Sequence, residues 1–492
     1  MILEGLSGVF VSLIIIIFFQ SLKFIKSVNN WIIVISKFVY YSGHPLLDDD
    51  QIYEQITKRF KNVFSSLVIV ILKIVFLFIV IFIAVALSSI VVSLLRGENL
   101  PNINSKDFLS FYFPKYLLHY PFIIGTLLPV AIIPFLKKEK VKRSIYSPME
   151  KFLHYTFLGN KNIALFLFKF ELWRNRKNLK TLSANQNVYI SGMARAGTTV
   201  LMQYLGQIEQ FKSLSYRNLP FLFLPKTWMS LTKKNKIKEK ERIHQDGIEH
   251  SLSSYEALEE PFWRNFIGEK YIKDITINYH TLDEKLFDHY NSFRRLVAGT
   301  KIYLAKNNNH LLRAESLHDL DKKIGNSTKT IIPFRDPFEQ SRSLLKQHKL
   351  LSGLQKEDEF TLDYMNFLVH HEFGLDHKVS VLGDETEFFQ GSQNRGTIEY
   401  WLEIWYLFYQ EAYLKFSNLE DFHFFCYENF VDHPKSSLEN LLIVLNLQKD
   451  LINTISINNF SPENREQIGD RNNKYMVLYK KMKSISLNKN NG

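Results

Sequence analysis

Hydrophobic residues are distributed unevenly along the 492-residue chain, and their pattern divides it into two regions. Three long apolar runs without Asp, Glu, Lys or Arg lie near the N-terminus, at residues 5–22, 74–95 and 116–136. Each run approaches or reaches the roughly 20 apolar residues that a helix needs to cross a bilayer. We therefore predict a membrane anchor in residues 1–143. Its three transmembrane helices are expected at about residues 5–25, 67–95 and 116–136.

After the anchor, short apolar runs alternate with longer stretches of helical periodicity. The runs that read as strands are residues 188–191, 301–305, 330–334 and 422–427. Strands separated by helices favour an α/β fold with a P-loop-like, mostly parallel sheet and flanking helices. We assign this domain to residues 144–487. The Asn/Lys-rich residues 488–492 are predicted to be a disordered tail.

Basic residues near the apolar runs predict the orientation of the anchor, because Lys and Arg are enriched in cytoplasmic flanks. The segment between the first two runs contains Lys23, Lys26, Lys37, Lys58, Arg59 and Lys61, and the third run is followed by Lys137, Lys138, Lys140, Lys142 and Arg143. Three crossings then place the N-terminus outside and residues 137–492 in the cytoplasm. Residues 31–41 are too short to span and are expected along the membrane surface.

Cysteine count and charge narrow the partners of the protein. Cys426 is the only cysteine, which excludes an intrachain disulfide and fits a reducing compartment. It lies in an apolar strand-like run, so we expect a buried structural thiol. The formal charge of +12 and the pI near 9.3 suit a protein that rests on anionic lipid and binds a polyanionic small molecule. Nucleic-acid binding is disfavoured, because the basic residues are scattered and no recognition motif is present.

Residues 187–205 contain the strongest motif of the chain. A strand-like run leads into a glycine loop, Gly192 to Gly197, and Thr198 then begins an apolar helical pattern. This layout points backbone N–H groups and a helix N-terminus at an anion. The lysine of a nucleotide-binding P-loop is replaced by Thr198, followed by Thr199, and Arg195 is the cation of the loop. The loop is poorly equipped for a β/γ-phosphate with its magnesium, but suits an anion that needs N–H donors, hydroxyls and a guanidinium.

Two further motifs follow predicted strands. The strand at 330–334 ends at Arg335, Pro337 is placed to start a helix, and Ser343 lies on that helix. The strand at 301–305 is followed directly by Lys306 and then by His310. Ligands of parallel α/β sheets bind beyond the carboxyl ends of the strands, so the three motifs are predicted to meet at one edge.

These motifs together resemble those of the sulfotransferases that use 3′-phosphoadenosine-5′-phosphosulfate (PAPS). Arg195, Gly197, Thr198 and Thr199 resemble the family loop that holds the 5′-phosphosulfate, with Ala196 at a position that is usually Ser or Gly. The resemblance extends over residues 185–447, including the stretch Tyr-Glu-Asn-Phe at 427–430. The membrane segments lie outside it.

The resemblance implies roles for the residues of the other two motifs. Arg335 and Ser343 would bind the 3′-phosphate, with surface pairing of Arg335 to Asp336 or Glu339 as the alternative. Lys306 would neutralise the leaving oxygen, and His310 would be the general base, since an ordinary imidazole accepts a proton near neutral pH. The alternative for His310 is a cap on the next helix.

The general base is the least defined residue of this hypothesis. Some relatives use a glutamate about twenty residues after the loop, where this chain has Ser215 to Arg217. Glu256 and Glu259 could supply a rival base or contact the acceptor, although a solvated helix face is the favoured interpretation.

Two aromatic- and histidine-rich stretches are interpreted as structural. His370, His371 and His377 lack the spacing that puts two imidazoles on one helix face, so no metal site is expected. Aromatic and small residues at helical spacing in 401–412 are expected in the core rather than on an acceptor platform, namely Trp401, Trp405, Phe408 and Ala412.

The sequence thus favours a membrane-anchored sulfotransferase that moves a sulfuryl group from PAPS to a hydroxyl or amine. The acceptor would be a lipid, a glycan or a small molecule at the membrane. No metal is expected, because the loop lysine and a clear metal-binding acid are both missing. The alternatives are a membrane-tethered nucleotide-binding or scaffold protein without transfer activity and an atypical P-loop kinase. The sequence does not determine the oligomeric state.

Overall fold

The computed structural model describes residues 2–97, 146–181, 185–232, 240–241, 249–250, 255, 257–383, 394–457 and 473–489. The chain divides into two compact units. The first comprises Met1–Ser42 and Asp49–Tyr155, and the second comprises Gly43–Asp48 and Thr156–Gly492.

The first unit is helical in its described residues, with α1 (Ile2–Ser21), α2 (Phe24–Tyr41), α3 (Asp49–Leu95) and the short α6 (Pro148–Leu153). Of the described helices, α3 is long and apolar enough to cross a membrane. Leu6–Ser21 and Phe24–Tyr41 meet this test only as one pair, which is bent by 46°. The predicted third span, at residues 116–136, lies outside the described residues.

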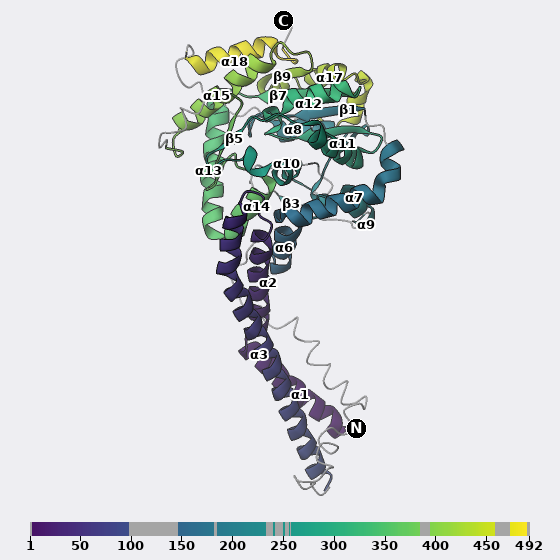
Figure 1. The fold of residues 1–492 in the computed structure, drawn as a ribbon, viewed down its shortest axis with the longest axis vertical. Helices are drawn as coiled ribbons and strands as arrows, with labels where there is room; N and C mark the ends of the chain where they lie inside the picture. The colour runs from purple at the N-terminus through teal and green to yellow at the C-terminus, as the bar shows by residue number, and fades with distance from the viewer. Residues whose placement is uncertain are drawn as a thin grey trace. The chain divides into compact units, whose positions relative to one another are not determined.

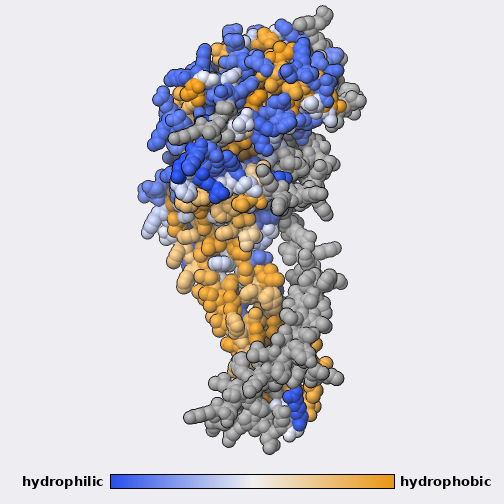
Figure 2. Space-filling view, turned by 90° about the vertical axis from the view of Figure 1, so that its right-hand side faces the viewer, coloured by the Kyte–Doolittle hydropathy of each residue, from blue (hydrophilic) through white to orange (hydrophobic). Residues whose placement is uncertain are grey.

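The helices of this unit expose many large hydrophobic side chains. Along α3 these include Leu72, Phe78, Ile79 and Ile83, each about half exposed or more. Figure 2 shows the resulting hydrophobic surface in orange. Burying so much apolar area in lipid would be favourable, and this surface supports the expectation of an anchor without establishing its orientation.

The second unit contains the predicted α/β domain, and five of its strands form one sheet in the order β2-β6-β1-β7-β9. These strands are β1 (Gln186–Ile190), β2 (Phe211–Lys212), β6 (Ile302–Lys306), β7 (Ser327–Phe334) and β9 (Phe422–Cys426). Every pairing in the sheet is parallel. The predicted parallel sheet is confirmed, and the short edge strand β2 is an addition that the sequence pattern did not indicate.

Helices and two small sheets surround this main sheet. The helices are α7 (Lys161–Thr181), α8 (Thr198–Leu205), α9 (Pro225–Thr232), α10 (Glu260–Phe266), α11 (Glu284–Ala298), α12 (Ala314–Lys323), α13 (Pro337–Glu357), α14 (Glu359–Leu368), α15 (Ile398–Phe416), α16 (Tyr427–Asp432), α17 (Pro434–Val444) and α18 (Lys474–Ile485). The small sheets pair β3 (Lys240–Glu241) with β4 (Glu249–His250) and β5 (Thr276–Asn278) with β8 (Val379–Val381).

Both faces of the main sheet are covered by helices, as Figure 1 shows. Successive side chains of a strand point to opposite faces. Val188 and Ile190 accordingly join a buried apolar cluster with residues of α8 and α17. Tyr189 points to the other face, where its hydroxyl lies 2.9 Å from that of Tyr290 on α11. Burial on both faces explains why the strands read as short, almost continuous apolar runs.

Two structural expectations for the C-terminal region are confirmed. Cys426 is fully buried, and burial raises the pKa of its thiol to about 12, so the thiol is held in its protonated form. The four residues expected in the core of α15 are all at most 4% exposed, namely Trp401, Trp405, Phe408 and Ala412.

The prediction that the disordered tail starts at residue 488 is wrong. Asn488 is 3% exposed, and its side chain accepts a hydrogen bond from Cys426 N (2.9 Å) and donates to Cys426 O (2.9 Å). The amide therefore satisfies the backbone at the end of β9. Composition alone did not reveal this, because the partner lies 62 residues earlier in the chain.

Candidate functional site

The loop after β1 has the backbone geometry of an anion-binding turn. Arg195 and Gly197 both have positive φ, at 69° and 86°. A non-glycine residue in this region is strained, and such residues cluster at functional sites. A Cβ on Gly197 would lie 2.5 Å from the ring of Tyr427, so glycine is required there for space as well as for conformation. Gln340 Nε2 supports the loop from α13 by donating to Ala194 O at 2.9 Å.

The loop and the helix after β7 are joined through their predicted site residues. Arg195 Nε donates to Ser343 Oγ at 2.9 Å, across 148 positions of sequence. The two motifs expected to hold opposite ends of one ligand thus lie side by side. Ala196 and Thr198, the remaining loop residues of the expected site, are 1% and 3% exposed.

The end of β6 lies against the start of α8. Ile190 is in register with Lys306 in the parallel pair of β1 and β6. Lys306 Nζ donates to Thr199 Oγ1 at 2.9 Å, which places the ammonium group at the N-terminal turn of the helix. A cation at a helix N-terminus is unfavourable by itself, because that end carries partial positive charge. Together the two positive features suit an anion.

The end of β7 contributes Arg335 to the same edge. Its guanidinium carbon lies 5.1 Å above the ring of Tyr427, the residue that begins α16 after β9. The alternative pairing with Glu339 is present, but at 3.8 Å with Glu339 25% exposed, and such partly exposed pairs contribute little energy. Asp336 instead caps α13, since its Oδ1 accepts from Phe338 N and Glu339 N. Basic residues from three neighbouring strand ends or loops therefore meet at one edge of the sheet.

The placement of His310 overturns its expected role as the general base. Its ring is fully buried, stacks on Tyr189 at 3.8 Å between centroids, and lies with Nε2 3.2 Å from Thr330 Oγ1. Burial first, and then electrostatic effects of the neighbouring His318 and Arg313, hold the pKa of His310 well below the ordinary value. Both β1 and β7 therefore bury the ring in the domain interior, where an acceptor hydroxyl does not reach it. The residue begins a 3₁₀ turn, His310–Leu312. Its expected alternative role as a cap on the next helix is also wrong, because Asn309 precedes the turn and Arg313 precedes α12 at the N-cap positions.

Glu259, one of the two rival bases, is also an interior residue. It is 1% exposed and accepts hydrogen bonds from Trp263 Nε1 (2.9 Å), Tyr303 OH (3.1 Å) and Asn307 Nδ2 (3.2 Å). Burial raises the pKa of its carboxyl, against the opposing effect of the Trp263 and Asn307 donors. Glu259 is neither on a solvated face nor open to an acceptor. The other rival, Glu256, lies outside the described residues.

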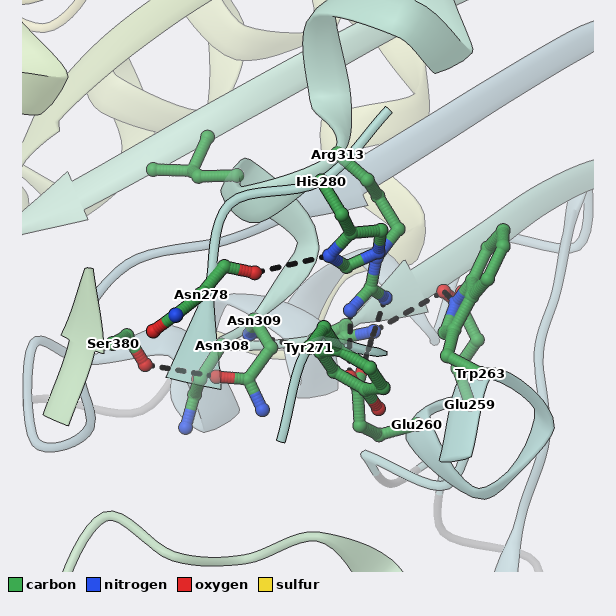
Figure 3. Close-up of polar contacts among 12 residues, drawn as sticks. Glu259, Glu260, Trp263, Tyr271, Asn278, His280, Asn308, Asn309, Arg313 and Ser380 are labelled. Atoms are coloured by element: carbon green, nitrogen blue, oxygen red, sulfur yellow. Dashed lines mark hydrogen bonds and ion pairs between the residues drawn. The ribbon is translucent and has the colours of Figure 1, made fainter. Parts of the chain in front are cut away.

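Next to Glu259, a second buried carboxylate is neutralised by an arginine, as Figure 3 shows. Arg313 donates to both oxygens of Glu260, at 2.9 and 2.6 Å, and Tyr271 OH donates to the same carboxylate at 2.9 Å. Burial acts to raise the pKa of Glu260, but Arg313 outweighs it and the net shift is downward. A carboxylate that is paired with an arginine and hydrogen-bonded in this way is held in its charged form and is not placed to act as a base.

Two residues that the sequence did not single out, Asn308 and Glu372, lie beside the strand end of β6. Asn308 Nδ2 donates to Glu372 Oε1 at 2.6 Å. Both residues line a pocket with Lys306 and His370, and both also line a neighbouring pocket next to Met193 and Ala194 of the loop. In the sequence, the only signal for Glu372 is its place in a histidine-dense stretch whose spacing does not fit a metal site. Within the described residues, no group of three or more His, Cys, Asp or Glu side chains is arranged to hold a metal.

Comparisons with known proteins add a distant structural similarity. Neither protein-family models nor curated protein sequences match the chain. Its fold is similar to sulfotransferase STF1 from Mycobacterium tuberculosis H37Rv, at 12% identity over 63% of this chain and 81% of that one, with a TM-score of 0.35. It is also similar to sulfotransferase STF9 from Mycobacterium avium (12% identity, 63% and 77% covered, TM-score 0.36) and to a sulfotransferase from Alicyclobacillus acidocaldarius (14%, 61% and 91%, TM-score 0.27). A similarity this distant does not assign a function to this chain.

Proposed function

We propose that this protein is a membrane-anchored sulfotransferase that transfers a sulfuryl group from PAPS to a hydroxyl or amine. The observation on which this rests is the meeting of three separate motifs through two hydrogen bonds, Arg195 to Ser343 and Lys306 to Thr199. The resemblance to the sulfotransferases implies that each motif contacts a phosphate or sulfuryl group. The motifs converge at the carboxyl edge of a parallel sheet, which is where such sheets bind ligands.

The residues of this edge fit the two charged ends of PAPS. Arg195, Gly197 and Thr199 would hold the 5′-phosphosulfate with a guanidinium, backbone N–H groups and a hydroxyl. Arg335 and Ser343 would bind the 3′-phosphate. Because Arg195 already contacts Ser343, one hydrogen-bonded network would link both ends of the site.

Lys306 would stabilise the leaving group during transfer. PAPS supplies the activated sulfuryl group, and the chemistry resembles phosphoryl transfer, where positioning and charge stabilisation provide most of the rate enhancement. Lys306 Nζ, which donates to Thr199 Oγ1, would neutralise the negative charge that develops on the 5′-phosphate oxygen.

The anchor would place this reaction at a membrane. We propose that the N-terminus lies outside, that the α/β domain is cytoplasmic, and that the acceptor is a lipid, a glycan or a small molecule close to the bilayer. Tethering raises the effective concentration of the domain at membrane substrates, which favours an acceptor of this kind.

A thermal-shift comparison on the purified full chain tests the cofactor. Adenosine 3′,5′-bisphosphate without metal should raise the melting temperature, since a ligand at 100 times its Kd stabilises the folded state by about 2.7 kcal/mol. ATP with magnesium should stabilise much less, because the loop lacks the P-loop lysine. A larger shift with ATP and magnesium would favour the kinase alternative. No shift with either nucleotide would favour a scaffold protein.

A further inference from the structure

The two pockets beside β6 have walls of different chemistry. The larger one encloses about 410 Å³ of empty space, open solvent at its mouth included, and is walled by apolar residues such as Leu344 of α13 and Trp401 and Phe408 of α15. The smaller one, about 210 Å³ on the same measure, reaches Lys306. Asn308 and Glu372 line both, so the pockets adjoin at this pair.

The Asn308–Glu372 pair leaves two buried acceptor atoms without partners among the described residues. Glu372 Oε1 accepts from Asn308, whereas Glu372 Oε2 is buried and has no hydrogen-bond partner there. A carboxylate only accepts, so the amide nitrogen of Asn308 must face it, and Asn308 Oδ1 is turned away. That oxygen is likewise buried without a partner in the described part of the chain.

His377 adds a third acceptor to the larger pocket. Its Nδ1 lies 3.0 Å from the carbonyl of His371, which can only accept, so Nδ1 holds the proton of the neutral ring. Nε2 then presents a lone pair, and it too is buried with no partner among the described residues. Burial lowers the pKa of His377 to about 3, which keeps the ring neutral and Nε2 an acceptor at pH 7.

The donors of the same pocket are already engaged. Lys378 Nζ donates to Asp274 O at 2.7 Å and to Asp376 Oδ1 at 2.9 Å. Ser380 Oγ donates to Asn309 Oδ1 at 3.0 Å, as Figure 3 shows. The pocket therefore offers acceptors and few donors, within apolar walls.

We infer that this pocket binds the acceptor substrate, as an amine or hydroxyl attached to an apolar group, and that Glu372 is the base that receives its proton. A buried acceptor atom without a partner costs free energy, and a ligand with an N–H or O–H donor would lower that cost. The role of Glu372 as the base in sulfuryl transfer rests on the proposed function. The class of ligand does not, because it follows from the pocket alone.

In the transfer step, the proton of the acceptor O–H or N–H moves to Glu372 as the acceptor atom bonds to sulfur. The bond between sulfur and the 5′-phosphate oxygen breaks, and its electron pair stays on that oxygen beside Lys306. Glu372 and Lys306 line the same pocket, so the residue that receives the proton and the residue that stabilises the leaving oxygen border one space.

Calorimetry with three probes of one skeleton tests the ligand class on the full chain in lipid nanodiscs, loaded with adenosine 3′,5′-bisphosphate. The probes are 2-phenylethylamine, 2-phenylethanol and phenylacetate, which differ in a charged donor, a neutral donor and an acceptor-only group. The amine should bind at least tenfold more tightly than phenylacetate. Glu372→Gln keeps the shape and should weaken amine binding by about 10- to 100-fold, as expected for loss of a charged partner. Phenylacetate binding as tightly as the amine, or unchanged amine binding in Glu372→Gln, would overturn the inference.

The control is Glu399→Gln, which removes an exposed carboxylate from α15, the helix that also supplies Trp401. This variant should bind all three probes as the wild type does. If it loses amine binding equally, general charge rather than the pocket is responsible, and the inference fails.

Release of adenosine 3′,5′-bisphosphate from PAPS, with 2-phenylethanol as the acceptor, tests the base. Glu372→Gln should slow release by about 10²- to 10⁴-fold while the thermal shift by the bisphosphate is unchanged. A normal rate in Glu372→Gln, a collapse in His370→Asn alone, or no release by the wild type would each overturn the assignment. Loss of the bisphosphate shift in the wild type would instead overturn the proposed function, and amine binding would remain a separate result.

Discussion

At the scale of single residues, the candidate site depends on a few positively charged side chains held in defined positions. Arg195 has a left-handed backbone and a hydrogen bond to Ser343, and Lys306 is held by Thr199. Strain of this kind persists only where surrounding contacts compensate for it. The site is therefore built before a ligand arrives, which lowers the entropy cost of binding.

Replacing Arg335 by Ala should weaken binding of adenosine 3′,5′-bisphosphate by about 10- to 100-fold, because a charge-assisted contact to phosphate is lost. Ser343→Ala should cost less, about 1 kcal/mol, since it removes one neutral hydroxyl. Isothermal titration calorimetry measures both. Arg342→Ala is the matched control, as Arg342 lies on α13 next to Ser343 and pairs with Glu339 at 3.0 Å. Unchanged affinity in Arg335→Ala would contradict the assignment of the 3′-phosphate site.

At the scale of elements, strand order decides which loops meet. β1 lies between β6 and β7, so the glycine loop after β1 is flanked by Lys306 on one side and Arg335 on the other. The turn after β6 folds back under the sheet and buries His310 against Tyr189 of β1. Lys306, the last residue of β6, therefore lies at the edge of the sheet, whereas His310, in the turn that follows, is buried in the interior.

His310→Ala should therefore lower stability and leave the transfer rate per folded molecule close to that of the wild type. A large-to-small change in a core costs about 2 to 5 kcal/mol. This cost should shrink as the pH falls from 7 to 5, because the unfolded chain protonates His310 near pH 6.5 whereas burial lowers its pKa in the folded state. The wild type therefore loses stability in acid through His310, and the His310→Ala variant does not.

Urea unfolding of the two proteins at pH 7 and pH 5, followed by fluorescence, measures the difference in stability. Single-turnover transfer at pH 7 provides the matching rate. A rate lowered 100-fold in a folded variant would restore His310 as the base, against its placement in the structure.

At the scale of the whole molecule, a basic α/β domain is attached to helices with large apolar surfaces. The net charge of +12 favours contact with anionic lipid, and α3 is long and apolar enough to cross a bilayer. Both features suit an enzyme whose acceptor is at the membrane. They do not depend on the chemistry of the site.

A reporter fused after Gly492 should show cytoplasmic activity, and one inserted at Asn102 should report the outside, because Lys and Arg are concentrated in the flanks assigned to the cytoplasm. Activity of paired reporters, each functional on one side of the membrane, measures this. An outside signal from the C-terminal fusion would contradict the orientation and separate the domain from a cytoplasmic supply of PAPS.

The sequence by itself determined four strands of the main sheet, β1, β6, β7 and β9, the helix that follows the glycine loop and the order of the three motifs that are proposed to bind an anion. These features are local, since apolar runs and turn residues express the conformation of their own segment. The parallel sheet followed from the alternation of strands and helices, and its ends bring Arg195, Lys306 and Arg335 together.

Only the tertiary structure decided which polar residues face the site. His310 lies close after Lys306 in sequence, and Glu259 lies in an acidic run between the first two motifs, yet both are buried among side chains from distant elements. Glu372 lies far from the loop in sequence. It lines the pocket beside Asn308, from which it accepts a hydrogen bond. Whether a side chain is in the core or in a pocket depends on contacts between segments far apart in the chain, and no local pattern records them.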